Sequence, residues 1–155
     1  MNPEYYGNTE ILSLHKIGFI CSRSTSSRAI LPCLDWATQH SGNNSTAIVS
    51  TFHSSLEQSV LKILTIGTCP IIVVVARAPY KALPEVYKPF FDSGRLLMAY
   101  ISSQHRITRE SAAAANRHIA DISQQTVFGY IDSAGSLAAL YAQLQAQGKE
   151  IEVLS

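Results

Sequence analysis

The segment Ile71–Ala76, with the sequence IIVVVA, restricts the fold more than any other feature of the chain. It is far shorter than a membrane span, is rich in β-branched residues, and has no alternation of apolar and polar positions. A strand that is apolar on both faces is expected where helices cover both sides of a sheet. The segment therefore predicts a buried strand of a parallel α/β sheet.

Strand-like segments alternate with segments of helical periodicity along the rest of the chain. The predicted strands are Lys16–Cys21, Thr46–Ser50, Ile71–Ala76, Leu96–Ile101, Thr126–Tyr130 and Glu150–Leu154. The predicted helices are Ala29–His40, Ser54–Ile66, Pro84–Ser93, Glu110–Ile122 and Ser136–Gln147. Right-handed crossovers give a doubly wound, Rossmann-like three-layer α/β/α sandwich with a mostly parallel sheet of about six strands. We assign residues 15–155 to this domain and 1–14 to an N-terminal tail or short added element.

Composition argues against several other classes of protein. The chain has 155 residues, of which 46% are hydrophobic and 15% charged, so we expect one folded domain rather than disorder. The net charge of +1 favours neither a nucleic acid nor a membrane as partner. The three cysteines form no CxxC pair, and we expect no metal and no cofactor. The N-terminus lacks the pattern of a signal peptide, which favours a cytoplasmic location.

Polar residues gather where ligands bind in such sheets, beyond the carboxyl ends of the strands. Six of the seven arginines follow a predicted strand or lie in the next helix, and Arg95 is the exception. Helix N-termini, hydroxyl groups and guanidinium forks all favour a phosphate-type anion. The predicted nucleic-acid or phosphate-binding residues are Ser22, Arg23, Ser24, Arg28, Ser50, Thr51, His53, Asn116, Arg117, Ser133, Gly135 and Ser136.

Other interpretations of these residues stay open. The serines and threonines fit a role as helix caps. His53 fits a base, a phosphate donor or a cap, and Cys21 fits an activated or an inert, packed thiol. Glu57 and Asp132 follow different strands and could form a carboxylate pair for acid–base chemistry. The aromatic residues that could stack on bases or fill the core are Trp36, Tyr80, Tyr87 and Tyr100. No GxGxxG, P-loop or GxSxG motif occurs, so no catalytic residue is assigned.

Four segments resemble the DNA-processing protein A (DprA/Smf) family. Cys21–Arg23 is similar to its Gly/Ala-Ser-Arg, and Ser50–Glu57 occupies the place of its Ser-Gly-x-Ala-x-Gly-Ile-Asp. Asn116–Ser123 is close to its Asn-Arg-Ile-Ile-Ala-Gly-Leu-Ser, and Ser133–Leu137 to its Ser-Gly-Ser/Thr helix start. The order and spacing agree from residue 17 to residue 154, so the chain looks like a divergent, single-domain member.

The resemblance implies a function and a set of residues. It implies binding of single-stranded DNA and help in loading a RecA-type recombinase during transformation or recombination, often as a homodimer. Arg23 is the first residue to carry over, followed by Asn116, Arg117 and Ser136. Two departures concern the same site. Thr51 and Ser55 stand where the family has glycines, and alanines at 112–115 replace a basic run.

Two alternatives accompany this hypothesis. The same positive edge could hold one nucleoside phosphate, as in a nucleotide-binding or nucleotide-processing Rossmann-like protein. The replaced glycines are also consistent with a scaffold that kept the fold and lost its ligand, because glycine lets a backbone approach a phosphate closely.

Overall fold

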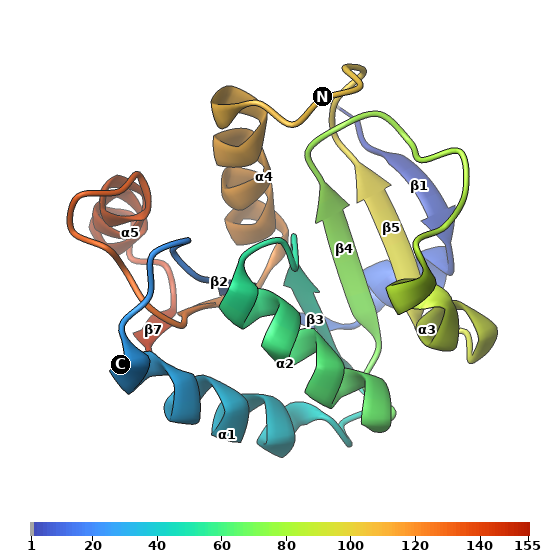
Figure 1. Ribbon diagram of the computed structural model, residues 1–155, viewed down its shortest axis with the longest axis horizontal. Helices are drawn as coiled ribbons and strands as arrows, with labels where there is room; N and C mark the ends of the chain where they lie inside the picture. The colour runs from blue at the N-terminus through green and yellow to red at the C-terminus, as the bar shows by residue number, and fades with distance from the viewer. Residues whose placement is uncertain (1) are drawn as a thin grey trace.

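A computed structural model describes residues 2–155 and shows a seven-stranded sheet between two layers of helices (Figure 1). The strands are β1 (Glu4–Gly7), β2 (His15–Ile20), β3 (Thr46–Ser50), β4 (Ile71–Val75), β5 (Leu96–Tyr100), β6 (Gln125–Phe128) and β7 (Ile151–Val153). The α-helices are α1 (Ile30–His40), α2 (Ser55–Ile66), α3 (Lys88–Asp92), α4 (Arg109–Ile122) and α5 (Leu137–Ala146). The 3₁₀-helices are η1 (Thr9–Ser13), η2 (Ser27–Ala29) and η3 (Glu85–Tyr87).

The order of the strands places a crevice at one edge of the sheet. The order is β1-β5-β4-β3-β2-β6-β7, and every neighbouring pair except β1 and β5 is parallel. The chain adds β3, β4 and β5 on one side of β2, then returns through α4 to add β6 and β7 on the other. Such a reversal is a topological switch point, and ligands of doubly wound sheets bind there, beyond the carboxyl ends of the strands.

The continuous apolar character of β4 follows from its place in the sheet. Ile71, Val73 and Val75 pack into a core cluster beneath α1, α2 and α3, whereas Ile72 and Val74 pack into a second cluster with α4 and α5. All five side chains are buried. The prediction of a strand covered by helices on both faces is confirmed, and with it the Rossmann-like fold class.

The N-terminal residues add a strand that the periodicity did not predict. Glu4–Gly7 pairs antiparallel with β5, with Tyr5 opposite Ala99 and Tyr6 opposite Met98. The sheet therefore has seven strands where about six were expected. All four residues of β1 are exposed, so the segment lacks the alternation that marks a half-buried strand.

The predicted helices match the observed ones closely, apart from the third. The segment expected as one helix over Pro84–Ser93 divides into η3 and the five-residue α3. Gly67 ends α2, and a glycine is needed there because of contact with the neighbouring turn. A Cβ at Gly67 would lie only 2.0 Å from the carbonyl oxygen of Ser41. That oxygen also accepts hydrogen bonds from the N–H groups of Thr68 and Cys69.

Three further observations concern classes of protein discussed above. Within residues 2–155, every helix is too short or too polar to cross a bilayer. The three cysteines are buried free thiols. The same residues contain no group of three or more His, Cys, Asp or Glu side chains arranged to hold a metal ion.

Candidate functional site

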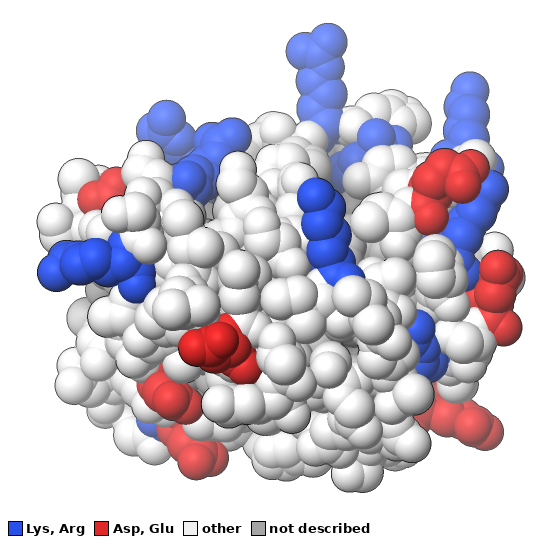
Figure 2. All heavy atoms as spheres, turned by 60° about the horizontal axis from the view of Figure 1, so that its bottom comes forward, with Lys and Arg blue, Asp and Glu red and all other residues white. Residues whose placement is uncertain are grey.

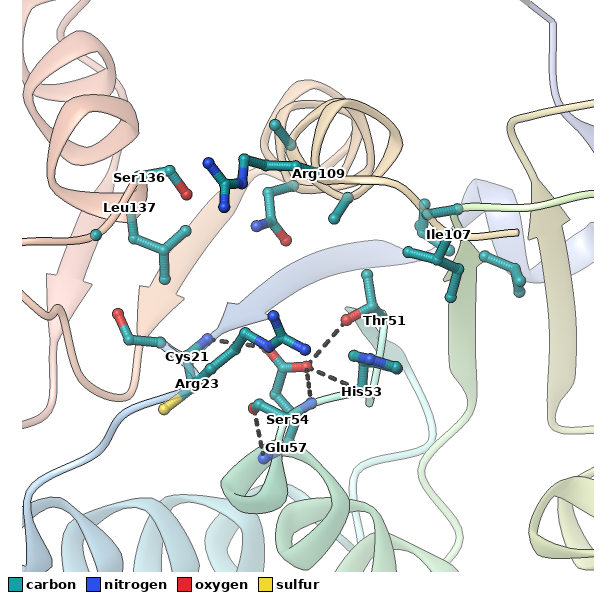
Figure 3. Close-up of a pocket in the computed structure, with 18 of the residues that line it drawn as sticks. Cys21, Arg23, Thr51, His53, Ser54, Glu57, Ile107, Arg109, Ser136 and Leu137 are labelled. Carbon is teal, nitrogen blue, oxygen red and sulfur yellow. Dashed lines mark hydrogen bonds between the residues drawn. The ribbon is translucent and has the colours of Figure 1, made fainter. Parts of the chain in front are cut away.

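A cavity of about 850 Å³ opens at the carboxyl edge of the parallel strands (Figure 3). Its wall is formed by the loops after β2, β3 and β6, by α4 and by the end of β4. Residues on both sides of the switch point, after β2 and after β6, line it together. The cavity is therefore at the position where a doubly wound sheet binds its ligands.

Two arginines face this cavity from different elements. Arg23 follows β2, Arg109 begins α4, and both side chains extend into the space between these elements in Figure 3. Both residues are exposed. The only ion pair within residues 2–155 joins Lys88 and Glu85 in the segment before β5, so neither cavity arginine is neutralised by a carboxylate at salt-bridge distance. Two free guanidinium groups are available to an anionic ligand.

One face of α4 forms the upper wall of the cavity. Arg109, Ala112, Ala113 and Asn116 all line it, at the spacing i, i+3, i+4, i+7 that places residues on one side of a helix. The two alanines leave space between the longer Arg109 and Asn116 side chains. Thr108 caps the helix, because its hydroxyl accepts a hydrogen bond from the Ser111 N–H at 3.0 Å. The capping fixes the first turn, and therefore Arg109.

Glu57 holds the loops at the floor of the cavity in place. One carboxylate oxygen accepts hydrogen bonds from the Thr51 hydroxyl and the His53 N–H, both at 2.9 Å, and from the Ser54 N–H at 3.2 Å. The other oxygen accepts from the Cys21 N–H at 2.9 Å. Glu57 is buried, and it forms a capping box with Ser54 at the start of α2. One carboxylate therefore joins the loop after β2 to the loop after β3.

This arrangement argues against the acid–base pair considered from the sequence. Three donors share Glu57 Oε1 and one binds Oε2, so both carboxylate oxygens hold loops. Asp132 accepts a hydrogen bond from the Ala134 N–H and holds its own loop. Both carboxylates line the cavity, and the contacts described for them are structural.

The loop after β3 contains an unusual backbone conformation. Phe52 has φ of 49°, the only positive φ of a non-glycine residue within residues 2–155, and its side chain is buried. Left-handed backbone is costly for a bulky residue and persists only where its surroundings hold it. The Ser50 hydroxyl accepts from the Phe52 N–H, and Glu57 binds the residues on either side. The family-like segment thus forms a tight turn without either glycine.

The thiol of Cys21 is a packed group rather than an activated one. Burial, and secondarily the nearby Glu57, raise the pKa of Cys21 to about 12. Only the thiolate is a strong nucleophile, so this cysteine is unreactive at neutral pH.

The structure brings together eight of the twelve residues predicted from the sequence. The residues that line the cavity are Ser22, Arg23, Ser24, Thr51, His53, Asn116, Gly135 and Ser136. The residues that do not line it are Arg28, Ser50, Arg117 and Ser133. Ser50 is fully buried beneath the turn, and Arg117 is one position beyond the cavity-facing side of α4. Arg28, in η2, and Ser133 are exposed elsewhere.

Sequence reasoning missed several lining residues. Arg109 was noted among the arginines after the fourth predicted strand but was not assigned to the site, although its spacing from Asn116 places both on one helix face. The other lining residues outside the predicted set are Cys21, Ser54, Glu57, Val73, Val74, Val75, Ala76, Tyr80, Tyr87, Ile107, Thr108, Ala112, Ala113, Asp132, Ala134 and Leu137. The apolar residues among them form a floor and rim of the cavity. A sequence search for phosphate-binding residues does not detect such apolar positions.

Of the arginines expected along this edge of the sheet, two line the cavity within residues 2–155, namely Arg23 and Arg109. Arg77 binds the Ala78 carbonyl oxygen and stacks over Tyr80, with its guanidinium carbon 4.5 Å from the ring centre. Arg106 and Arg117 are exposed but outside the cavity lining. On the face shown in Figure 2, which brings the α1 side of the molecule forward, acidic and basic side chains are scattered among broad uncharged areas. The positive charge available to a ligand in the cavity is therefore that of Arg23 and Arg109.

Comparisons with known proteins identify the fold. No family model and no curated protein sequence matches the chain. Among solved structures, it is similar to DNA processing protein A from Streptococcus pneumoniae, with a TM-score of 0.77 and 16% identity over 96% of this chain. It is similar to DNA processing protein A from Helicobacter pylori, described for its single-stranded DNA binding mode, with a TM-score of 0.75 and 16% identity over 96% of the chain.

The fold is that of DNA processing protein A. The DprA-like, Rossmann-type fold expected from the four sequence segments is confirmed. The chain spans 53% of the Streptococcus pneumoniae protein and 69% of the Helicobacter pylori protein. A molybdenum cofactor carrier protein from Chlamydomonas reinhardtii is also similar, with a TM-score of 0.60 and 12% identity over 91% of this chain and 76% of that one. One fold thus serves proteins with different ligands, so function depends on the cavity itself.

Proposed function

We propose that this DprA-like chain binds single-stranded DNA by its phosphate backbone in the cavity at the carboxyl edge of the sheet. The observation that carries the proposal is the pair Arg23 and Arg109, which face one cavity from two elements without carboxylate partners in residues 2–155. Hydroxyl and amide groups of Ser24, Ser136 and Asn116 supply further donors around the same cavity. The shared fold with a protein described as binding single-stranded DNA supports this choice of ligand.

Fluorescence anisotropy with a labelled oligothymidine of about 12 nucleotides tests the proposal. We expect micromolar binding that Arg23→Ala and Arg109→Ala each weaken for all base sequences alike. Arg28→Ala and Arg117→Ala are matched controls, because these arginines are exposed but do not line the cavity. Equal losses in all four variants would show that only general surface charge binds DNA.

Salt dependence gives a second measure. Two phosphate contacts on a single strand predict a slope of log K against log salt concentration of about −1.4. Removing either arginine should reduce the magnitude of the slope by about 0.7. A slope that both variants leave unchanged would place the phosphate contacts elsewhere on the chain.

The cavity also favours one alternative ligand. Its apolar floor of Val73–Ala76, Tyr80 and Tyr87 and its volume of about 850 Å³ suit a single nucleotide, whose base would lie on the floor below the arginines. A thermal-shift screen with mono- and dinucleotides tests this reading. A rise in Tm with a nucleotide, together with no binding of the oligonucleotide, would replace the first proposal with the second.

The biological setting is a further step of the proposal. We place the chain in DNA processing during recombination or transformation, with a RecA-type recombinase and a second copy of the chain as partners. The support is the DprA-like fold. Light scattering measures the homodimer, and a pull-down with a RecA-type recombinase in the presence of oligonucleotide measures the other contact. If light scattering shows a strict monomer and the pull-down retains no recombinase, neither partner belongs to the proposed function.

A further inference from the structure

A second, smaller cavity lies beside the first at the same edge of the sheet. It has a volume of about 170 Å³, and Tyr80 lines both cavities. Three further tyrosines line it: Tyr5, Tyr6 and Tyr100. Tyr5 and Tyr6 are 40% and 48% exposed, which is high for large aromatic side chains.

The direction of β1 brings two of these tyrosines to the ligand edge. β1 is antiparallel to β5, and its first residue, Glu4, lies opposite Tyr100 at the carboxyl end of β5. Tyr5 and Tyr6 follow directly. A parallel edge strand would have placed its first residues at the other end of the sheet. The tyrosines therefore line the same edge as Arg23 and Arg109.

The rings are arranged for stacking rather than for burial in the core. Tyr6 stacks on Phe91 with ring centres 5.4 Å apart and planes within 5°. The rings of Tyr80 and Tyr100 meet edge to face at 6.0 Å. The Arg77 guanidinium also lies over the Tyr80 ring, with its carbon 4.5 Å from the ring centre. Planar groups of the protein already associate face to face here, and a nucleobase presents the same kind of surface.

The charges at this cavity favour a base over a phosphate. Its charged lining residues are Glu4 and Lys81, and no arginine of residues 2–155 lines it. The carboxylate of Glu4 repels a phosphate but tolerates a neutral ring. The first cavity has guanidinium groups and the second has tyrosines, which are the two components that sequence-independent binding of single strands combines.

We propose that the cavity lined by Tyr6, Tyr80 and Tyr100 is a base-stacking subsite for a DNA strand whose backbone is held by Arg23 and Arg109. Tyr5 lies opposite Ala99, so β1 directs its side chain to the other face of the sheet. This inference rests on the proposed function. Four steps between strands separate β2 from β1, or about 19 Å at ~4.8 Å per step. At a rise of about 3.4 Å per nucleotide, a strand needs about six nucleotides to reach from Arg23, after β2, to Tyr6 on β1.

The experiment compares a short and a long oligothymidine, of about three and about 12 nucleotides, by competition against a labelled oligonucleotide. We expect Tyr6→Leu to weaken binding of the long strand by about five- to tenfold and to leave the short strand unaffected. Tyr6→Phe keeps the ring and should retain wild-type affinity. Tyr5→Leu is the matched control on the opposite face of the sheet and should bind both strands as wild type does. Because both residues are exposed, the leucine variants should keep the wild-type Tm.

Each outcome decides the matter. If Tyr6→Leu binds both strands as wild type does, the stacking subsite is wrong and the arginine cavity stands. If wild type binds neither strand, the proposed function fails and the subsite with it. If Tyr6→Leu and Tyr6→Phe lose affinity equally, the hydroxyl group acts rather than the ring, and stacking is excluded.

Discussion

At the candidate site, the side chain of Glu57 accepts hydrogen bonds from four donors. It lies at the start of α2 and binds donors from residues 21, 51, 53 and 54. The family-like segment placed a carboxylate at this position, and the Ser54-x-x-Glu57 spacing is a capping-box signal in the sequence. The additional bond to Cys21 was not predictable, because it joins two loops that are distant in the chain and meet only in the folded sheet.

Replacing Glu57 by glutamine should destabilise the protein and weaken DNA binding together. The amide nitrogen is a donor and cannot accept the N–H of Cys21 or of the neighbouring loop, so buried donors lose their partner. We expect a loss of about 1–3 kcal/mol in the free energy of unfolding, measured by urea denaturation. Glu10→Gln, at an exposed position in η1, is the control and should change little. An unchanged free energy of unfolding in Glu57→Gln would show that contacts other than the Glu57 carboxylate hold these loops in place.

Helix α4 shows where element-level prediction succeeded and where it failed. Its extent was predicted from periodicity, within one residue at its start. The face toward the cavity was chosen from a motif that includes Arg117, yet the structure turns Arg109 and Asn116 inward. Periodicity gives the relative positions of side chains on a helix, whereas the rotation of that helix on the sheet depends on packing.

Filling the gap on α4 should block the cavity without harming the fold. Ala113→Leu places a larger side chain between Arg109 and Asn116, in open space rather than in the core. We expect oligonucleotide affinity to fall at least about tenfold while Tm stays unchanged, because leucine is nearly as good a helix former as alanine. Ala142→Leu on the exposed side of α5 is the matched control and should bind as wild type. Normal binding by Ala113→Leu would mean that the ligand avoids α4.

Other elements show why some of the fold escaped prediction. The long strands and helices have enough residues for their periods to be recognised, and their bounds agree with the structure within a few positions. β1 and α3 have four and five residues, too few to establish a period. Both lie on the β5 side of the molecule. The tyrosine cavity includes residues of β1 and was therefore not predicted from the sequence, although Tyr80 and Tyr100 were considered as stacking residues.

At the scale of the whole molecule, the distribution of charge differs from the sequence expectation. The net charge is +1, and the arginines do not form one continuous rim. Arg95 illustrates another use of a guanidinium group. It donates hydrogen bonds to the carbonyl oxygens of Leu64, near the end of α2, and of Cys69, shortly before β4. A sequence gives the number of arginines after strands, but their side-chain directions follow from tertiary contacts.

Stability should fall as the pH drops below neutrality because of two partly buried histidines. Burial lowers the pKa of His40 on α1 and of His118 on α4. The unfolded chain then binds more protons than the folded one near and below pH ~6.5, so their contribution is complete above that value and is lost as the pH falls through the lower folded pKa. Thermal melts from pH 8 to pH 5 measure the effect.

His118→Gln should flatten this pH dependence. His118 Nε2 is one of two buried side-chain polar atoms without a hydrogen-bond partner within residues 2–155, so its protonated form gains no compensating bond there. His105→Gln, at an exposed position, should leave the curve unchanged. If both variants follow the wild-type curve, the acid sensitivity arises from other groups.

The antiparallel β1 has a practical consequence for anything attached to the chain. β1 starts at the carboxyl edge of the sheet, and β7, which is parallel to β6, finishes at that same edge. The first and last strands are also the two outermost ones. A dye or affinity tag joined to either terminus would thus emerge on the rim that we assign to ligand, flanking it from opposite ends. A donor and acceptor dye placed there would bracket a bound strand and report its passage by energy transfer.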